Sequence, residues 1–239
     1  MINKDITFII PAAGKSSRFK SDKSKIFYDY KNKPLILHTV DKCLRFSNNI
    51  VIIINKKNIR QLKKILAIYK KIKFTYVFQN QAKGMGHAIS LGLKKCKTKN
   101  TCVIWSDQIF LTLSTMNKTI TFFKKNNSLL CFPVIKKKLP YVYILRDVHN
   151  FFKDIIQTRE GGRIVKTGES DCGFFVFKTH IIRALLEHLI KQKKIFTKKT
   201  KEIDFLKAFK FFKKIGKLDV VKAKSIKDTI GINTIEDLI

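Results

Sequence analysis

The sequence predicts an α/β fold with one mostly parallel, mixed sheet and helices on both of its faces. Short continuous apolar runs alternate with amphipathic stretches through the first half of the chain. This alternation is typical of a parallel sheet that is buried on both sides. With 239 residues, 45% of them hydrophobic, the chain is also long enough to bury a sizeable core.

The first half alternates regularly between predicted strands and predicted helices. Continuous apolar runs predict strands at 6–12, 49–55, 74–79, 101–107 and 128–135. Apolar residues at helical spacing predict helices at 34–46, 58–72, 86–96 and 114–126. The first helix begins at Pro34, where the missing N–H of proline costs no hydrogen bond. Strand and helix in alternation favour parallel strand pairing.

After about residue 140 the rhythm changes. Apolar runs predict strands at 141–147, 151–158, 172–177 and 218–223, with two helices before the last of them. The stretch 205–215 has apolar residues at helical spacing and is predicted to be a packing helix. These elements predict an antiparallel excursion in the sheet. Because no linker rich in Pro, Gly or Ser interrupts the chain, we expect one domain, with continuous halves at 1–135 and 136–239.

The composition is strongly basic, with 50 Lys and Arg against 17 Asp and Glu and a formal net charge of +33. Lysines occur in nearly every segment instead of gathering in one motif. This spread favours a solvated surface over a specific nucleic-acid interface. A positive field of this kind also attracts phosphorylated small molecules.

The cysteines indicate a reducing compartment. They are odd in number, have no C-x-x-C spacing and fall mostly in apolar runs, at positions 43, 96, 102, 131 and 172. We therefore expect buried thiols in the cytoplasm. The charged residue Asp5 directly precedes the first predicted strand, a signal peptide is not expected, and no window is apolar enough to span a membrane. The oligomeric state is left open.

Candidate ligand residues follow the predicted strands, because ligands of open α/β sheets bind at the carboxyl ends of the strands. The segment AAGKSSRFKSDKSK (12–25) follows the first strand and combines small residues with Lys15, Arg18 and Lys25. Small residues let backbone N–H groups approach an anion, and the cations add charge. Neither the P-loop pattern nor the dinucleotide fingerprint fits this segment. It predicts a phosphate site of another kind.

Two further strand ends carry suitable residues. The segment QNQAKGMGHAI (79–89) follows the third strand and places a glycine turn before a helix. Asp107 follows the fourth strand, where a carboxylate can hold a hard cation that bridges phosphates. Within these segments, His87 is expected to form a hydrogen bond at the helix start, and Trp105 is expected to pack in the core. Three strand ends that meet at one edge predict a joint site for phosphates and a metal ion.

The opening segment PAAGKSSRFKSDKSKIFYDYKNKPLI (11–36) resembles the opening pattern of nucleotidyltransferases, which is A-A-G-x-x-[ST]-R, then P-K, then G-K-P-[LM]-[IL]. Further matching segments in the same order lie at 79–93, 103–111, 169–177 and 231–238. Together they are similar to the uridylyltransferase domain of bifunctional GlmU-type enzymes, which make UDP-N-acetylglucosamine, and to sugar-phosphate nucleotidyltransferases. The resemblance implies the Rossmann-like fold of nucleotide-diphospho-sugar transferases.

The resemblance also implies a reaction and its residues. A nucleotidyl group would pass from an NTP, with UTP favoured and CTP an alternative, to a phosphorylated acceptor such as a sugar 1-phosphate, with release of pyrophosphate. The implied nucleotide-binding residues are Ala12, Ala13, Gly14, Lys15, Gln79 and Gly84. The implied catalytic residues are Arg18 and Lys25, and the implied Mg²⁺ ligands are Asp107 and Asn233.

The acceptor is less closely defined by the resemblance. Tyr143, Gln157 and Asp171 fall where acceptor contacts are implied, but Asp171 replaces an expected asparagine and Gln157 lies near an expected glutamate. A carboxylate at 171 suits an amine-bearing acceptor. A cytidylyltransferase for a phosphorylated amino alcohol or another small non-sugar acceptor is therefore one alternative. A non-catalytic protein that binds nucleotides or nucleic acid is another.

Overall fold

The computed structural model describes residues 3–14, 19 and 23–238. Its centre is an eight-stranded sheet in the order β10-β7-β11-β6-β1-β4-β5, in which β12 also pairs with β7. The strands are β1 (Ile6–Pro11), β4 (Ile50–Ile54), β5 (Thr75–Phe78), β6 (Asn100–Ile104), β7 (Leu130–Lys138), β10 (Thr167–Asp171), β11 (Phe174–Lys178) and β12 (Leu218–Lys222). Four of them, β6, β1, β4 and β5, pair in parallel. The mostly parallel first half of the prediction is confirmed.

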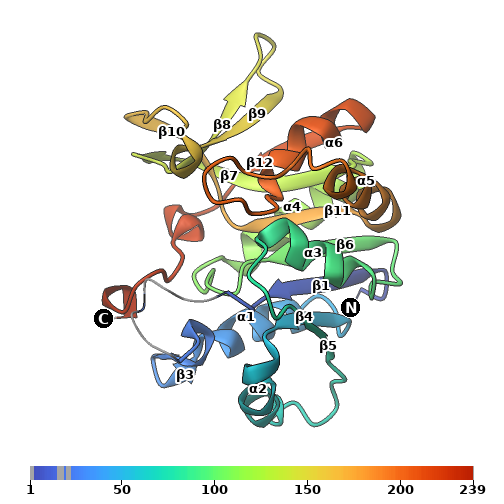
Figure 1. Cartoon of the computed structure of the whole chain (residues 1–239), viewed down its shortest axis with the longest axis vertical. Helices are drawn as coiled ribbons and strands as arrows, with labels where there is room; N and C mark the ends of the chain where they lie inside the picture. Colours follow the sequence, from blue (N-terminus) through green and yellow to red (C-terminus); the bar gives the residue numbers. More distant parts are fainter. Residues whose placement is uncertain (1–2, 15–18, 20–22, 239) are drawn as a thin grey trace.

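The antiparallel excursion lies at the other end of the sheet. β11 runs antiparallel to both β6 and β7, and β10 runs antiparallel to β7. Between β10 and β11 the chain kinks at Gly173, which has a positive φ of 65°. A separate hairpin of β8 (Val142–Arg146) and β9 (Phe152–Gln157) stands at the upper end of Figure 1.

Helices cover both faces of the sheet, as predicted (Figure 1). Alternate residues of β1 show why: Ile9 packs into one core cluster, whereas Phe8 and Ile10 pack into another. The first cluster includes residues of α3 (Met85–Leu93), α5 (Thr179–Lys191) and α6 (Phe209–Ile215). The second includes residues of α1 (Leu35–Leu44), α2 (Ile59–Leu66) and α4 (Leu113–Lys125). β1, every residue of which is buried, is therefore covered on both sides.

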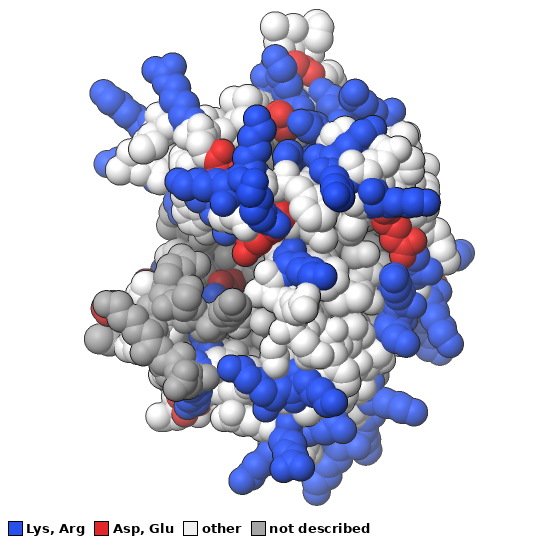
Figure 2. All heavy atoms as spheres, in the orientation of Figure 1, with Lys and Arg blue, Asp and Glu red and all other residues white. Residues whose placement is uncertain are grey.

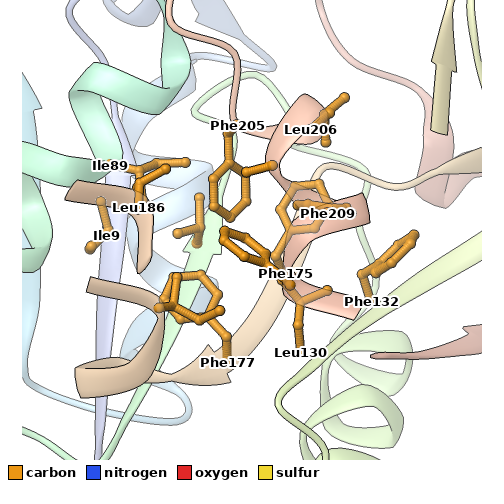
Figure 3. Close-up of a cluster of buried hydrophobic side chains, with 14 of the residues drawn as sticks. Ile9, Ile89, Leu130, Phe132, Phe175, Phe177, Leu186, Phe205, Leu206 and Phe209 are labelled. Carbon is orange, nitrogen blue, oxygen red and sulfur yellow. The ribbon is translucent and has the colours of Figure 1, made fainter. Parts of the chain in front are cut away.

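Phenylalanine rings pack against one another in the first cluster, together with leucine and isoleucine side chains (Figure 3). The rings of Phe205 and Phe209 meet edge to face with centroids 5.2 Å apart, and Phe209 lies 5.5 Å from Phe175 on β11. Such edge-to-face pairs add to the stabilisation that burial gives. The predicted packing helix at 205–215 is confirmed, as the short 3-10 helix η5 (Leu206–Ala208) followed by α6.

Several element boundaries differ from the prediction. α2 ends at Leu66 instead of 72, and beyond it the Tyr69 hydroxyl donates to Asp41 on α1. α1 begins at Leu35, with Pro34 as the residue before it. β10 was not predicted, because its sequence TGESD has no apolar run. The hairpin of β2 (Asp29–Tyr30) and β3 (Lys33–Pro34) is also additional.

The remaining elements are short 3-10 helices. They are η2 (Lys25–Phe27), η3 (Lys56–Asn58), η4 (Thr158–Glu160), η6 (Ile226–Thr229) and η7 (Glu236–Leu238). Figure 2 shows Lys and Arg side chains spread over the upper, right and lower parts of the visible surface. In the described part of the chain, every helix is too short or too polar to cross a bilayer.

Candidate active site

A cavity of about 390 Å³ lies at the carboxyl ends of β1, β5 and β6. This volume is in the range of small-molecule sites. The first half of the chain supplies most of its wall, including the segment after β1, the turn before α3, and the segment after β6. Arg159 in η4 and Glu202 supply the wall from the second half, and Asn233 contributes near the C-terminus. The predicted meeting of three strand ends is therefore present in the structure.

Lys25 and Asp107 meet in this cavity. The Lys25 ammonium nitrogen lies 2.5 Å from one carboxylate oxygen of Asp107 and also donates to the carbonyl oxygen of Ile232 at 3.3 Å. Both side chains are mostly buried, with 18% and 17% of their surface exposed. Lys25 was predicted to act on a phosphate and Asp107 to hold a metal ion. The structure places these two side chains in direct contact.

The C-terminal segment completes this part of the site. The Ile232 N–H donates to the backbone oxygen of Asp107 at 3.0 Å, which brings Asn233 into the cavity wall. Asp228 anchors the segment: it is fully buried and accepts bonds from the Thr112 N–H, the Thr115 hydroxyl and the Ser225 N–H at 2.7, 2.6 and 3.0 Å. Sequence reasoning did not identify Asp228.

The donor set near Asp107 fits a divalent metal ion of the magnesium type. A Cβ added at Gly231 would lie 3.6 Å from both the Asp107 carboxyl carbon and the Asn233 amide nitrogen, so these two side chains flank one position. That nitrogen donates to the Gly231 carbonyl oxygen at 2.9 Å, which leaves the Asn233 amide oxygen as its possible ligand atom. The described residues contain no cluster of three His, Cys, Asp or Glu side chains. Mg²⁺ is commonly held by only one or two carboxylates plus substrate phosphates, so the small size of this donor set agrees with Mg²⁺.

The segment after β1 is shaped for close backbone approach. Ala12 and Ala13 are buried and line the cavity together with Gly14. A Cβ added at Gly14 would meet no atom of the described residues within 4 Å. Lys15 and Arg18, predicted from sequence to contact phosphates, lie outside the described residues.

Gln79 is held in a fixed orientation at the far end of the cavity. Its amide nitrogen donates to the Gly84 carbonyl oxygen at 3.2 Å and lies 3.0 Å from His87 Nδ1. Because a carbonyl oxygen only accepts, the amide nitrogen is the donor in both contacts, and neutral His87 accepts at Nδ1. Burial, together with Lys83 and Lys94, lowers the pKa of His87 and favours this neutral form. The predicted hydrogen-bonding role of His87 is present, and the Gln79 amide oxygen is the atom left for a ligand.

The turn that contains Gly84 is bounded by the chain's own backbone. Gly84 has a φ of 91°, and a Cβ there would lie 2.6 Å from the Ile203 carbonyl oxygen. Gly86 N–H donates to that same oxygen at 2.8 Å, and Ile203 N–H donates to the Lys83 oxygen. The segment around Ile203 therefore explains the need for glycine here, in addition to the predicted approach of a base.

Several cavity residues were not predicted as ligand contacts, among them Trp105, Arg159 and Glu202. Trp105 packs against Phe175 with ring centroids 5.1 Å apart, as expected for a core residue, but it also lines the cavity. Arg159 and Glu202 lie in polar turns without any pattern that marks them. Arg159 and Glu202 reach the cavity through the packing of η4 on the segment near Ile203, which is a long-range contact that a local sequence pattern does not predict.

The predicted acceptor residues lie outside the cavity wall, among the residues described. The Tyr143 hydroxyl donates to the Arg163 carbonyl oxygen at 3.0 Å, and the Gln157 amide donates to Asp204. Asp171 accepts a bond from the Gly173 N–H at 2.8 Å in the kink between β10 and β11. Burial raises the pKa of this carboxyl group. Contact of these three residues with an acceptor stays a prediction.

An α/β sheet with a cavity across its strand ends, a lysine and a carboxylate at the centre and a glycine turn at one side defines a nucleotidyltransferase. The MobA-like NTP transferase domain family matches residues 8–196. The chain belongs to this family, so the predicted nucleotidyltransferase resemblance is confirmed.

Relatives support this assignment. The chain is 28% identical over 190 residues to the bifunctional protein GlmU of Thermodesulfovibrio yellowstonii, covering 77% of this chain and 40% of that protein. It is 32% identical over 125 residues to the bifunctional enzyme IspD/IspF of Pelagibacter ubique, covering 52% and 33%. The chain spans less than half the length of these curated relatives.

The fold is also found in solved structures. A UDP-glucose pyrophosphorylase complexed with UDP-glucose superposes with a TM-score of 0.73 at 21% identity, covering 100% of this chain and 96% of that one. The 4-diphosphocytidyl-2C-methyl-D-erythritol synthase of Anaerococcus prevotii superposes with a TM-score of 0.70 at 20% identity, covering 98% and 95%. The predicted Rossmann-like nucleotide-diphospho-sugar transferase fold is confirmed.

Proposed function

We propose that this protein transfers a nucleotidyl group from UTP to a phosphorylated small molecule, most simply a sugar 1-phosphate, and releases pyrophosphate. The observation that carries the proposal is the meeting of Lys25 and Asp107 in a cavity walled by both halves of the chain. The nucleotide would bind to the half at 1–135 and the acceptor to the half at 136–239.

The reaction follows from the charges in the cavity. An oxygen of the acceptor phosphate forms a bond to the α-phosphorus, and the bond from that phosphorus to the bridging oxygen breaks, with the electron pair leaving on pyrophosphate. The acceptor phosphate is already ionised, so no general base is needed. Lys25 would neutralise the charge that develops on the α-phosphate, and preorganised charge of this kind is a major source of catalysis in phosphoryl transfer.

Asp107 and Asn233 would hold Mg²⁺, and Lys15 and Arg18 would contact the phosphates. When bound, Mg²⁺ would supply positive charge that stabilises the negative charge of the phosphates. Ala12, Ala13 and Gly14 would lie against the nucleotide, and the Gln79 amide oxygen would accept a hydrogen bond from the base. A cytoplasmic location is part of this proposal, and the five free, buried cysteines support it.

Transfer from CTP is the second candidate. The relative from Anaerococcus prevotii is named as a diphosphocytidyl synthase, and the IspD/IspF enzyme is 32% identical to the matched part of this chain. The Gln79 amide oxygen suits either base, because uracil N3–H and cytosine N4–H₂ are both donors.

A pyrophosphate-release assay tests the proposal. UTP and CTP are each supplied with Mg²⁺ and with glucose 1-phosphate, N-acetylglucosamine 1-phosphate, inositol 1-phosphate or phosphocholine. We expect release with UTP and a sugar phosphate that depends on both substrates. Release only with CTP would favour the second candidate, and release with no combination would contradict both.

A further inference from the structure

Arg159 is the cation that the second half of the chain contributes to the cavity wall. Its side chain is 54% exposed, and its guanidinium lies between two carboxylates, with Nη2 3.5 Å from Glu202 Oε2 and Nε 3.8 Å from Glu160 Oε1. Both separations are longer than a well-formed hydrogen bond. The guanidinium is therefore oriented by its neighbours but keeps its capacity to donate to a further anion.

The turn that carries Arg159 is fixed by Gln157. The Gln157 amide donates to a carboxylate oxygen of Asp204, 47 positions away. Asp204 is buried, and its other carboxylate oxygen accepts from the Leu206 N–H at 2.8 Å, at the start of η5. Its neighbour Ile203 is bonded in turn to the glycine turn before α3. Gln157 thus ties η4 to the same segment that presents Glu202.

We infer that Arg159 binds the phosphate of the acceptor, and that Gln157 positions Arg159 through Asp204 instead of touching the acceptor. This inference rests on the proposed function and departs from the contact that the resemblance implies for Gln157. It adds a binding residue and a positioning residue to the acceptor side of the site.

The direction of the reaction supports this assignment. In-line attack requires the acceptor phosphate to approach the α-phosphorus from the side opposite the departing pyrophosphate. If the phosphates of the nucleotide lie along the segment after β1, the acceptor phosphate enters from the wall of the second half. Among the described residues that line the cavity, Lys25 and Arg159 carry a positive charge, and Arg159 belongs to that wall. A guanidinium binds phosphate well because it donates two parallel hydrogen bonds.

Phosphate binding tests Arg159 without knowledge of the acceptor. Trp105, the single tryptophan of the chain, lines the cavity, so its fluorescence is the readout for ligand binding. The protein is first saturated with a non-hydrolysable UTP analogue and Mg²⁺, and is then titrated with inorganic phosphate. Loss of one charge-assisted contact should weaken phosphate binding by about 10-fold or more in Arg159→Gln. Binding of the analogue should be unchanged.

Arg163→Gln is the matched control. Arg163 is exposed and does not line the cavity, so this variant removes one charge from the same stretch of chain. Equal phosphate binding in the parent and Arg159→Gln would overturn the assignment, and so would a parent complex that binds no phosphate. An equal loss in the Arg163 variant would show a general charge effect and would overturn it as well. Failure of the UTP analogue to bind would instead contradict the proposed function.

A reciprocal exchange tests the positioning role of Gln157. Gln157→Glu places two carboxylates against each other, and we expect phosphate affinity to fall by about 10-fold. Adding Asp204→Asn restores a pair of one amide and one carboxylate, and the asparagine oxygen can still accept from the Leu206 N–H. We expect the double variant to recover parental phosphate affinity. Unchanged phosphate affinity in Gln157→Glu would overturn the positioning role. It would also be overturned if the folded double variant bound phosphate as weakly as Gln157→Glu.

Discussion

The Lys25 ammonium nitrogen lies 2.5 Å from a carboxylate oxygen of Asp107, although the two residues are 82 positions apart. Lys25 lies in the segment that follows β1 and Asp107 in the segment that follows β6, and each was predicted to contact a different charged ligand. Their contact sets the distance between the proposed catalytic cation and the proposed metal ligand. It makes both residues sensitive probes of the proposed chemistry.

Asp107→Ala should lower turnover by about 10³-fold or more, since it removes the carboxylate proposed to hold the metal ion. The fold should persist, with a fall in Tm of a few degrees, because a partly buried ion pair contributes about 1 kcal/mol. Pyrophosphate release and thermal unfolding are measured together, with exposed Asp29→Ala as the control. Asn233→Ala should raise the Mg²⁺ concentration needed for half-maximal rate. Near-parental turnover in folded Asp107→Ala would contradict the mechanism.

Lys25→Ala should lower kcat by about 10²-fold, the scale of losing one preorganised charge at a phosphoryl transition state. Arg18→Ala should have a similar effect according to the sequence-based prediction. Steady-state kinetics separate the two possible roles of each residue. A higher KM with unchanged kcat would make the residue an ordinary binding contact.

The nucleotide affinity should fall in acid because of His87. Its pKa lies below the usual value, so the ring is neutral at pH 7 and accepts from Gln79. As the pH falls through this lowered pKa, Nδ1 gains a proton and can no longer accept, and Gln79 loses its orientation. The KM for the NTP, measured from pH 5 to pH 8, should rise in acid for the parent and less so for His87→Asn. The exposed His180→Asn variant should follow the parent, and an identical profile for all three would exclude this role.

The sequence predicted the cavity residues of the first half of the chain much better than those of the second half. Asp107 and Gln79 follow buried strands, and the carboxyl ends of parallel strands meet at one edge by geometry alone. Arg159 and Glu202 instead lie in turns whose positions depend on a contact between Gln157 and Asp204. No local pattern encodes such a contact. β10 was missed for a related reason, since its polar residues are held by pairing with β7 and not by burial of an apolar run.

Asp171→Asn separates a structural role from an acceptor contact. Burial raises the carboxyl pKa in the folded protein, so stability falls as the pH rises from the unfolded-state pKa through the folded-state pKa. Asparagine removes this penalty and can still accept from the Gly173 N–H. The gain in Tm over the parent should therefore be larger at pH 7 than at pH 3. A higher KM for the acceptor, with a shift towards neutral sugar phosphates, would support the contact predicted from sequence.

Alanine substitutions at glycines test the close packing of the segment around Ile203 against the turn before α3, through the loss of unfolding free energy. Gly84→Ala combines positive φ with a close contact and should cost about 3 kcal/mol or more. Gly161→Ala has a φ of 92° with open space around it and should cost about 1 to 2 kcal/mol. Gly86→Ala, which has the contact without the positive φ, should cost about 1 to 3 kcal/mol. Denaturant unfolding gives the loss of unfolding free energy for all three variants. Equal losses in Gly84→Ala and Gly161→Ala would show that the contact with Ile203 does not add to the loss.

The bonds of Asp228 set an order of events during synthesis of the chain. Thr112, which donates to Asp228, leaves the ribosome 116 residues earlier, or roughly 6 to 23 s earlier at typical translation rates. The strands β1, β4, β5 and β6 can pair during that interval, since all of them precede Thr112. Asn233 and the backbone at Ile232 reach Asp107 only when the segment around Asp228 has emerged and docked. In a nascent chain the strands β6, β1, β4 and β5 could therefore be paired well before Asn233 completes the proposed site.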